Sequence, residues 1–178
     1  IGKKLSPLDI SDSSVQVFNS SNNHIYEYAN PNVTIVDAQQ IADDYLLGSK
    51  YSGHILTIDN EQERAFFSGS GEFQSLINDY VGKSWLGINL ENDEWVYSSL
   101  NSDLTSTVDY FNWGSDQPRT DHSGYLWAIN GGNTWTSGYN LSYTQHLILE
   151  FDGYDNNVVS DFHVGDTISS KLIDASST

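Results

Sequence analysis

Two short segments near the start of the chain alternate apolar and polar residues, which is the pattern of a half-buried β-strand. They are residues 15–18 (Val-Gln-Val-Phe) and 24–28 (His-Ile-Tyr-Glu-Tyr). We expect a strand in each, the first within a stretch that is rich in serine and aspartate.

A helical spacing of apolar residues follows. Thr34 stands three residues before Asp37, and both side chains can accept hydrogen bonds from the free N–H groups of a first turn. Gly48 is typical of a helix end. The apolar positions of the predicted helix are Ile35, Ala38, Ile41, Ala42 and Tyr45.

A second helix is predicted after the short apolar run 53–58. Asn60 and Glu63 have the spacing of a capping box, and Ala65-Phe66-Phe67 comes next. We expect this helix to break near 69–71 (Gly-Ser-Gly) and to resume as far as Tyr80.

The pattern changes at Trp85, from where the chain is predicted to be β-structure joined by long loops. Asn130-Gly131-Gly132 is a strong signal for a hairpin turn. Residues 98–125 are polar and interrupted by Gly and Pro, and a loop of this length in a compact domain is usually functional. The predicted strands are 85–88, 94–97, 126–129, 134–135 and 146–151.

The charge of the chain limits its partners. The formal net charge is −17 and the pI is about 4.2. Nucleic acid is an unsuitable partner because its binding relies on cationic side chains, and an anionic membrane surface is unsuitable for the same reason. Two interpretations of the acidity remain open: bound Ca²⁺, which takes six to eight oxygen ligands, or an acidic, salt-adapted surface.

The chain contains no Cys and no Met. Its fold must therefore be held by core packing or by metal rather than by disulfides. The sequence contains no run of 18 or more apolar residues, the length that would predict a membrane-spanning helix. We interpret the 178 residues as one monomeric domain cut from a longer chain.

The order of the motifs resembles that of the C-type lectin-like domain over residues 24–151. Residues 56–63 (Leu-Thr-Ile-Asp-Asn-Glu-Gln-Glu) are similar to one conserved stretch of that family, and Trp85-Leu86-Gly87-Ile88 is similar to its core motif. Residues 111–118, with Phe-Asn-Trp and Gln-Pro, resemble its binding loop. Trp135 and Glu150 stand where the family has its Trp-Asn-Asp and its closing Glu.

The resemblance implies an α+β fold, with two helices packed on small antiparallel sheets and a long ligand-binding loop. It divides the chain into a lead-in segment 1–23, the lectin-like domain 24–151 and an extension 152–178 that packs on the domain or leads out of it. Cys-free, acidic modules of this kind resemble the ligand-binding domains of large Ca²⁺-dependent bacterial adhesins of the RTX type, which implies an extracellular position on the cell surface and a role in biofilm formation.

The resemblance also implies Ca²⁺ as the cofactor, at two places. Asp116, Gln117 and Asp121 form an oxygen cluster in the loop, although Thr136-Ser137 replaces the family's Asn-Asp. Pro118 is implied to be cis, as in the family. Glu63 and Glu150 are implied to approach each other and hold a structural Ca²⁺; the alternatives are a cap for Glu63 and an edge position for Glu150.

Arg119 is where the chain departs most from the sugar-binding pattern. It is the only Lys or Arg between Lys83 and Lys171, and a guanidinium cannot bind Ca²⁺ because it has no acceptor. It is either an ion-pair partner of a neighbouring Asp or a bidentate clamp on a ligand carboxylate. Other candidate ligand contacts are Gln117, Asp121, His122, Tyr125 and Tyr139.

Known catalytic motifs are missing: there is no Gly-x-Ser-x-Gly and no His-Glu-x-x-His. We therefore expect a non-enzymatic, Ca²⁺-dependent adhesin module that recognises a peptide or protein end on a target cell. The alternatives are a Ca²⁺-dependent carbohydrate-binding lectin and a structural spacer.

Overall fold

The computed structural model describes residues 15–19, 21–44, 46–47, 51–68, 71, 73, 83–97, 107–119, 123–127, 134–138, 142–151 and 171–174. Two helices occur in this part of the chain, α2 (Ile35–Asp44) and α3 (Glu61–Phe66). The strands are β1 (Val15–Asn19), β2 (His24–Val33), β3 (Leu46–Leu47), β4 (Tyr51–Ser52), β5 (His54–Ile55), β6 (Lys83–Glu91), β7 (Glu94–Tyr97), β8 (Ser123–Trp127), β9 (Thr134–Gly138), β10 (Gln145–Phe151) and β11 (Lys171–Asp174).

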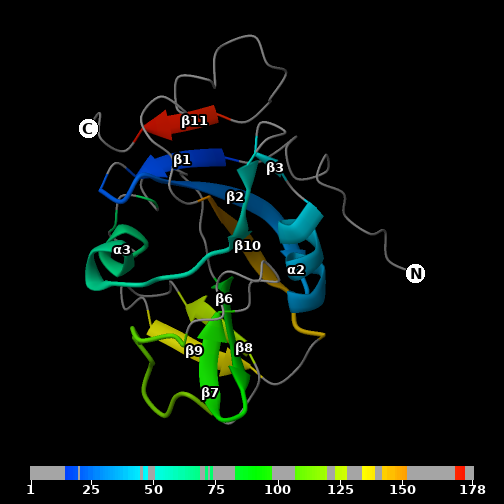
Figure 1. Cartoon of the computed structure of the whole chain (residues 1–178), viewed down its shortest axis with the longest axis vertical. Helices are drawn as coiled ribbons and strands as arrows, with labels where there is room; N and C mark the ends of the chain where they lie inside the picture. The colour runs from blue at the N-terminus through cyan, green and yellow to red at the C-terminus, as the bar shows by residue number, and fades with distance from the viewer. Residues whose placement is uncertain are drawn as a thin grey trace.

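One large sheet runs through the molecule in the order β11-β1-β2-β10-β6-β8-β9, with β5 paired to β10 and β7 to β6. Strands β1, β2 and β11 lie at one end and β6 to β9 at the other, with β10 between them (Figure 1). The sheet is mixed, because β1 pairs with β11 and β10 with β6 in parallel. Strands β3 and β4 form a separate pair.

The α+β fold class predicted from the sequence is confirmed, with helices α2 and α3 in the expected order. The expected small antiparallel sheets are instead joined into one large mixed sheet, because β10 pairs with both β2 and β6. The described parts of the segments before residue 24 and after 151 also contribute strands, β1 and β11, to the sheet. Strands β8 and β9 pair as the predicted hairpin, whose turn 130–132 lies outside the described residues. The predicted irregular loop ends earlier than expected, because β8 begins at Ser123.

Helix α2 begins as its sequence predicts. The Thr34 hydroxyl accepts a hydrogen bond from the Asp37 N–H at 3.1 Å and donates one to the Asp37 carboxylate at 2.9 Å. The helix ends at Asp44 rather than near Gly48, because Leu46 and Leu47 pair with Ser52 and Tyr51 instead.

Helix α3 begins at the predicted cap, since the Asn60 side chain accepts a hydrogen bond from the Glu63 N–H at 2.9 Å. Its first segment ends at Phe66, and Gly71 lies so close to the end of the helix that a Cβ there would be 2.4 Å from the Ala65 carbonyl oxygen. The predicted continuation to Tyr80 lies outside the described residues, apart from Phe73.

One core cluster joins side chains of α3 to those of the sheet, and α2 also buries apolar residues. The indole Nε1 of Trp85 donates a hydrogen bond of 2.7 Å to the buried Val33 carbonyl, which joins β6 to the end of β2. In the part of the chain that the structure describes, no helix is long and apolar enough to cross a membrane. The core cluster contains Val17, Tyr26, Tyr28, Leu56, Ile58, Phe66, Phe67, Phe73, Leu86, Ile88, Val108, Trp135 and Ile148.

Candidate functional site

The loop that carries the sequence-predicted site lies along strand β9. The Trp135 N–H donates to the Asn112 carbonyl at 2.8 Å, and the Gly114 N–H donates to the Trp135 carbonyl at 2.9 Å. Trp113 and Trp135 thereby form a parallel bridge. The backbone of 112–114 is consequently fixed to the sheet.

Aromatic side chains hold the same loop from the side. The Trp135 ring is fully buried and packs edge-on against Trp113, with ring centroids 5.6 Å apart. Trp113 also contacts Trp95 of β7, at 4.7 Å between centroids, and stacks with the exposed Phe111. The tryptophans of this motif are therefore mainly structural, and Phe111 is the ring that faces solvent.

Beyond Trp113 the loop is closed by contacts between Gln117, Arg119 and Ser137. The Gln117–Pro118 peptide bond is cis, as the resemblance implied. The Gln117 Oε1 accepts from the Ser137 N–H at 2.9 Å and lies 3.1 Å from the Ser137 hydroxyl. That hydroxyl also accepts from the Arg119 N–H at 2.7 Å and lies 3.1 Å from the Arg119 carbonyl oxygen. We call these contacts the Ser137 clasp.

The Ser137 clasp uses the side-chain oxygen of Gln117, which is a predicted Ca²⁺ ligand. A carbonyl oxygen has two lone pairs, and the Ser137 N–H uses one of those of Gln117 Oε1. The Ser137 hydroxyl has a single proton, for which Gln117 Oε1 and the Arg119 carbonyl compete at 3.1 Å each. Ca²⁺ binding by Gln117 stays a prediction, in which the ion takes the lone pair that faces this hydroxyl. Of the other two ligands predicted in the loop, Asp116 is exposed to solvent and Asp121 lies outside the described residues.

Arg119 is exposed at the edge of the clasp. Its backbone N–H and carbonyl are both engaged by Ser137. Its guanidinium forms no ion pair with any other residue that the structure describes, and the predicted partner Asp116 is not bonded to it. Among the remaining predicted contacts, Tyr125 lies in β8 opposite Thr136, whereas His122 and Tyr139 lie outside the described residues.

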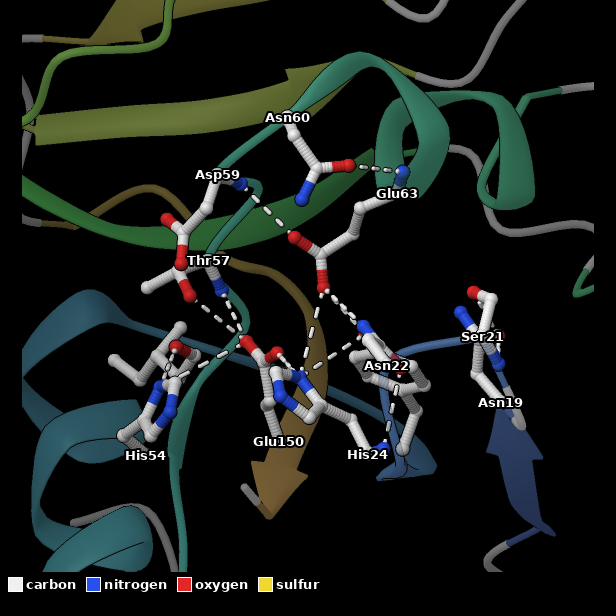
Figure 2. A network of polar contacts seen from close by, with 12 residues as sticks. Asn19, Ser21, Asn22, His24, His54, Thr57, Asp59, Asn60, Glu63 and Glu150 are labelled. Carbon is white, nitrogen blue, oxygen red and sulfur yellow. Dashed lines mark hydrogen bonds and ion pairs between the residues drawn. The ribbon is translucent and has the colours of Figure 1, made fainter. Parts of the chain in front are cut away.

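Glu63 and Glu150 come together in the interior, far from this loop in sequence. Glu63 lies in the first turn of α3 and Glu150 near the end of β10, and their side chains are only 3% and 1% exposed. Each is joined by hydrogen bonds to several neighbours (Figure 2). The approach of the two carboxylates agrees with the expectation from the sequence; metal binding by them stays a prediction.

Burial and mutual repulsion change the acidity of this pair. Burial, and after it the charge of Glu150, raises the pKa of Glu63 to about 8. Tyr26 donates its hydroxyl to Glu63 Oε1, and burial raises the pKa of Tyr26 well above its usual value. Two such carboxylates are stabilised by either a shared proton or a bound cation.

His24 belongs to this cluster and was not among the predicted site residues. Its Nδ1 lies 2.7 Å from Glu150 Oε1 and 3.7 Å from Glu63 Oε1, and its side chain is 21% exposed. The alternation of 24–28 places His24 and Tyr26 on one face of β2. In the sheet, Tyr26 pairs with Glu150 of β10, so the Glu150 side chain lies on the same face as those of Tyr26 and His24. The sequence did not reveal this register.

Comparison of the chain with known proteins identifies its fold through solved structures. No family model and no curated protein matches the chain. Solved structures that resemble it include human lithostathine, with 19% identity, a TM-score of 0.59 and coverage of 76% of this chain and 96% of that one.

Two further structures give the same result. The C-type lectin CEL-I from Cucumaria echinata is 16% identical, with a TM-score of 0.57 over 72% of this chain and 89% of that one. The carbohydrate-recognition domain of the mouse scavenger receptor C-type lectin is 22% identical, with a TM-score of 0.52 over 74% and 91%. These likenesses show that the chain has the C-type lectin fold.

Proposed function

We propose that the protein is a non-catalytic binding module that recognises a ligand carboxylate, above all the end of a peptide or protein, through Arg119. The observation that carries this proposal is the exposed guanidinium beside a loop whose backbone is fixed by the Ser137 clasp. A guanidinium presents a planar fork of donors that matches a carboxylate in a bidentate geometry.

The fixed backbone matters because ordering a loop on binding costs free energy. Here the positions of 112–114 and of Arg119 are set by hydrogen bonds to β9 before any ligand arrives. The side chain of Arg119 is the main part left to order. The acidity of the chain makes this cation selective, because Arg119 is the only Lys or Arg between Lys83 and Lys171 in the sequence.

Ca²⁺ enters the proposal at the loop, where Asp116 and Asp121 would supply carboxylate oxygens. Gln117 would join them through the lone pair of Oε1 that faces the Ser137 hydroxyl, while it keeps its bond to the Ser137 N–H. In this proposal Ca²⁺ lowers the repulsion between the acidic loop and an anionic ligand, so that binding weakens when the ion is removed.

The setting that we propose is the surface of a bacterial cell, with the module as the monomeric, ligand-binding part of an adhesin that attaches cells to a target. The support for this is the C-type lectin fold combined with an acidic sequence that has no cysteine. Such a fold requires core packing or metal in place of disulfides.

A Ca²⁺-dependent glycan lectin is the second candidate. Its support is that similar structures are named as carbohydrate-recognition domains, including one of cow CD23 in the presence of an oligosaccharide. Phe111 adds an exposed aromatic face next to Trp113. Sialic and uronic acids satisfy both candidates, because they carry a carboxylate.

Binding arrays separate these candidates. We expect peptides with a free C-terminal carboxylate to bind and the same peptides with amidated ends to bind on the order of 10-fold more weakly or worse, as for a lost charge-assisted pair. Arg119→Ala should abolish the difference, and Arg119→Lys should restore it only in part. Arg64→Ala, which removes equal charge from α3, is the matched control.

Three outcomes would overturn parts of the proposal. Arg119→Ala that binds every ligand as the wild type does would remove the clamp. Neutral sugars that bind tightly and compete with all other ligands would favour the glycan lectin. Unchanged binding in EDTA would remove Ca²⁺ from the loop while leaving Arg119 in place.

A further inference from the structure

Three donor atoms from separate elements converge beside the first turn of α3. They are Nδ1 of His24 at the start of β2, Oε1 of Glu63 in α3 and Oε1 of Glu150 in β10, and all lie within 4.8 Å of one another. Figure 2 shows the two carboxylates directed at the same space beside the His24 ring.

Each carboxylate divides its two oxygens in the same way. Oε2 of Glu63 accepts from the Asp59 N–H at 2.9 Å, and Oε2 of Glu150 accepts from the Thr57 N–H at 2.8 Å and the Thr57 hydroxyl at 2.9 Å. These bonds fix both groups and place each Oε1 on the side of His24, where Oε1 of Glu63 also accepts from the Tyr26 hydroxyl. Hydrogen bonds of this type orient carboxylates that bind metals.

The nearest amide supplies a donor rather than a further oxygen. Asn22 uses its Oδ1 to accept the His24 N–H at 3.1 Å, so its Nδ2 faces the cluster, 3.1 Å from Glu63 Oε1. The other nearby histidine, His54, has its Nδ1 2.8 Å from the Ile55 carbonyl, where it donates a hydrogen bond. Neither contact adds an acceptor.

These contacts do not fit Ca²⁺, the ion that the resemblance implied for Glu63 and Glu150. Ca²⁺ takes six to eight oxygen ligands. The described residues direct two carboxylate oxygens into the site, together with one ring nitrogen, one NH₂ group and the Tyr26 hydroxyl, which donates its proton to Glu63 Oε1. That is still fewer oxygen ligands than Ca²⁺ takes. Imidazole and carboxylate together suit Zn²⁺ and similar divalent ions, with three protein ligands and one open position.

We propose that His24, Glu63 and Glu150 form a site for a divalent transition-metal ion of the Zn²⁺ class rather than for Ca²⁺. Tetrahedral ligands of Zn²⁺ lie about 3.4 Å apart, given metal–ligand distances near 2.1 Å. The His24–Glu63 separation of 3.7 Å is close to this value. The His24–Glu150 separation of 2.7 Å is that of a hydrogen bond, and the ion would replace that proton and widen the gap.

The site would connect three elements of the fold, since His24 lies in β2, Glu63 in α3 and Glu150 in β10. Strand β2 also pairs with β1, which pairs with β11. Because His24 is the most exposed of the three ligands, it marks the side from which an ion enters. This role is separate from ligand binding at Arg119.

The test uses the whole chain, freed of metal by a chelator and then titrated with ZnCl₂, CoCl₂ or CaCl₂. We expect one Zn²⁺ per chain, a higher melting temperature with Zn²⁺ than with equal Ca²⁺, and visible Co²⁺ absorption of tetrahedral coordination. Excess CaCl₂ should not displace the Zn²⁺. Displacement of the bound Zn²⁺ by excess CaCl₂, or Co²⁺ spectra without tetrahedral coordination, would overturn the proposal, whereas Ca²⁺ bound at the loop leaves the Zn²⁺ in place.

Variants locate the ion. His24→Ala should weaken Zn²⁺ binding at least about 10- to 100-fold, the range known for the loss even of supporting groups. His146→Ala, which removes a histidine of β10 beside Tyr28, should bind as the wild type does. Equal Zn²⁺ affinity in both variants would refute a role for His24. If His24→Ala does not fold, the Zn²⁺-against-Ca²⁺ competition and the Co²⁺ spectrum of the wild type still decide.

Discussion

A single serine, Ser137, joins both ends of the segment 117–119 to strand β9. Ser137 stands where the family motif has an Asp, and it contacts Gln117 through its N–H and hydroxyl and Arg119 through its hydroxyl. The hydroxyl thereby bridges two positions of the loop, and these hydrogen bonds are formed by protein atoms alone.

Ser137→Ala tests this function of the hydroxyl. The Arg119 N–H would lose its acceptor and Gln117 Oε1 would lose one donor, so we expect a loss of about 1 kcal/mol in the free energy of unfolding. Urea denaturation measures it. Thr136→Ala is the control on the opposite face of the same strand, expected to change stability by about 0.5 kcal/mol or less.

If the two variants lose the same stability, the clasp has no special role. If Ser137→Ala is destabilised but binds carboxylate peptides as the wild type does, Arg119 does not need its backbone to be fixed.

At the scale of the elements, strand β6 packs very closely on the segment that follows β5. The Gly87 N–H donates to the Leu56 carbonyl at 2.7 Å, and a Cβ on Gly87 would lie 2.6 Å from the Ile55 carbonyl oxygen. Backbone cannot move aside as a flexible side chain can. The glycine of the Trp-Leu-Gly-Ile motif is therefore explained by this close approach.

Gly87→Ala should consequently force β6 away from β5 and cost about 1–3 kcal/mol, as overpacking usually does. Gly114→Ala is the matched control, because its added Cβ would meet its nearest atoms only at 3.4 Å, which is ordinary contact. Thermal denaturation of the two variants gives the comparison. A Gly87→Ala protein as stable as Gly114→Ala would show that the strands can separate without cost.

Local signals in the sequence predicted the elements well. The Thr34 and Asn60 caps, the buried strand at Trp85 and the β8–β9 hairpin depend on residues close in sequence, and all are present. The end of α2 was placed too late, since Gly48 is a weaker signal than the pairing of Leu46 and Leu47 with β4.

What the sequence did not reveal depends on contacts between distant segments. His24 reaches Glu150 only because β2 and β10 pair in one particular register, and periodicity carries no information about register between strands 126 residues apart. The parallel pairing of β1 with β11 is hidden for the same reason. The approach of Glu63 and Glu150 was expected only through the family resemblance.

At the scale of the whole molecule, repulsion outweighs attraction. The chain has 24 Asp and Glu against 7 Lys and Arg, so most pairs of surface charges have the same sign. One of the few cations, Arg64, is already bonded to Glu61. Net charge of this size destabilises a compact state. Screening by salt should therefore remove more repulsion than attraction.

Raising NaCl from 0.01 M to 0.2 M, with EDTA present throughout, should accordingly stabilise the protein. The screening length falls from about 30 Å to less than 10 Å over this range. Repulsion between acidic groups that lie far apart on the surface is therefore felt at the lower salt concentration and largely screened at the higher one. We expect a rise of about 1 kcal/mol in stability, or about 2–4 °C in melting temperature for a chain of this size.

EDTA removes divalent ions, so that any change in stability comes from screening by NaCl. NaCl is chosen over sulfate salts, because sulfate also stabilises proteins by being excluded from their surface. A second series at constant NaCl with added ZnCl₂ in place of EDTA should raise the melting temperature further, because one ion at His24 acts on local repulsion that screening reaches poorly in the interior. A melting temperature that stays flat or falls as NaCl increases would mean that the acidic groups are spaced widely enough to tolerate one another. The acidic side chains would then simply form a well-solvated surface, and screening of their repulsion by cations would not stabilise this fold.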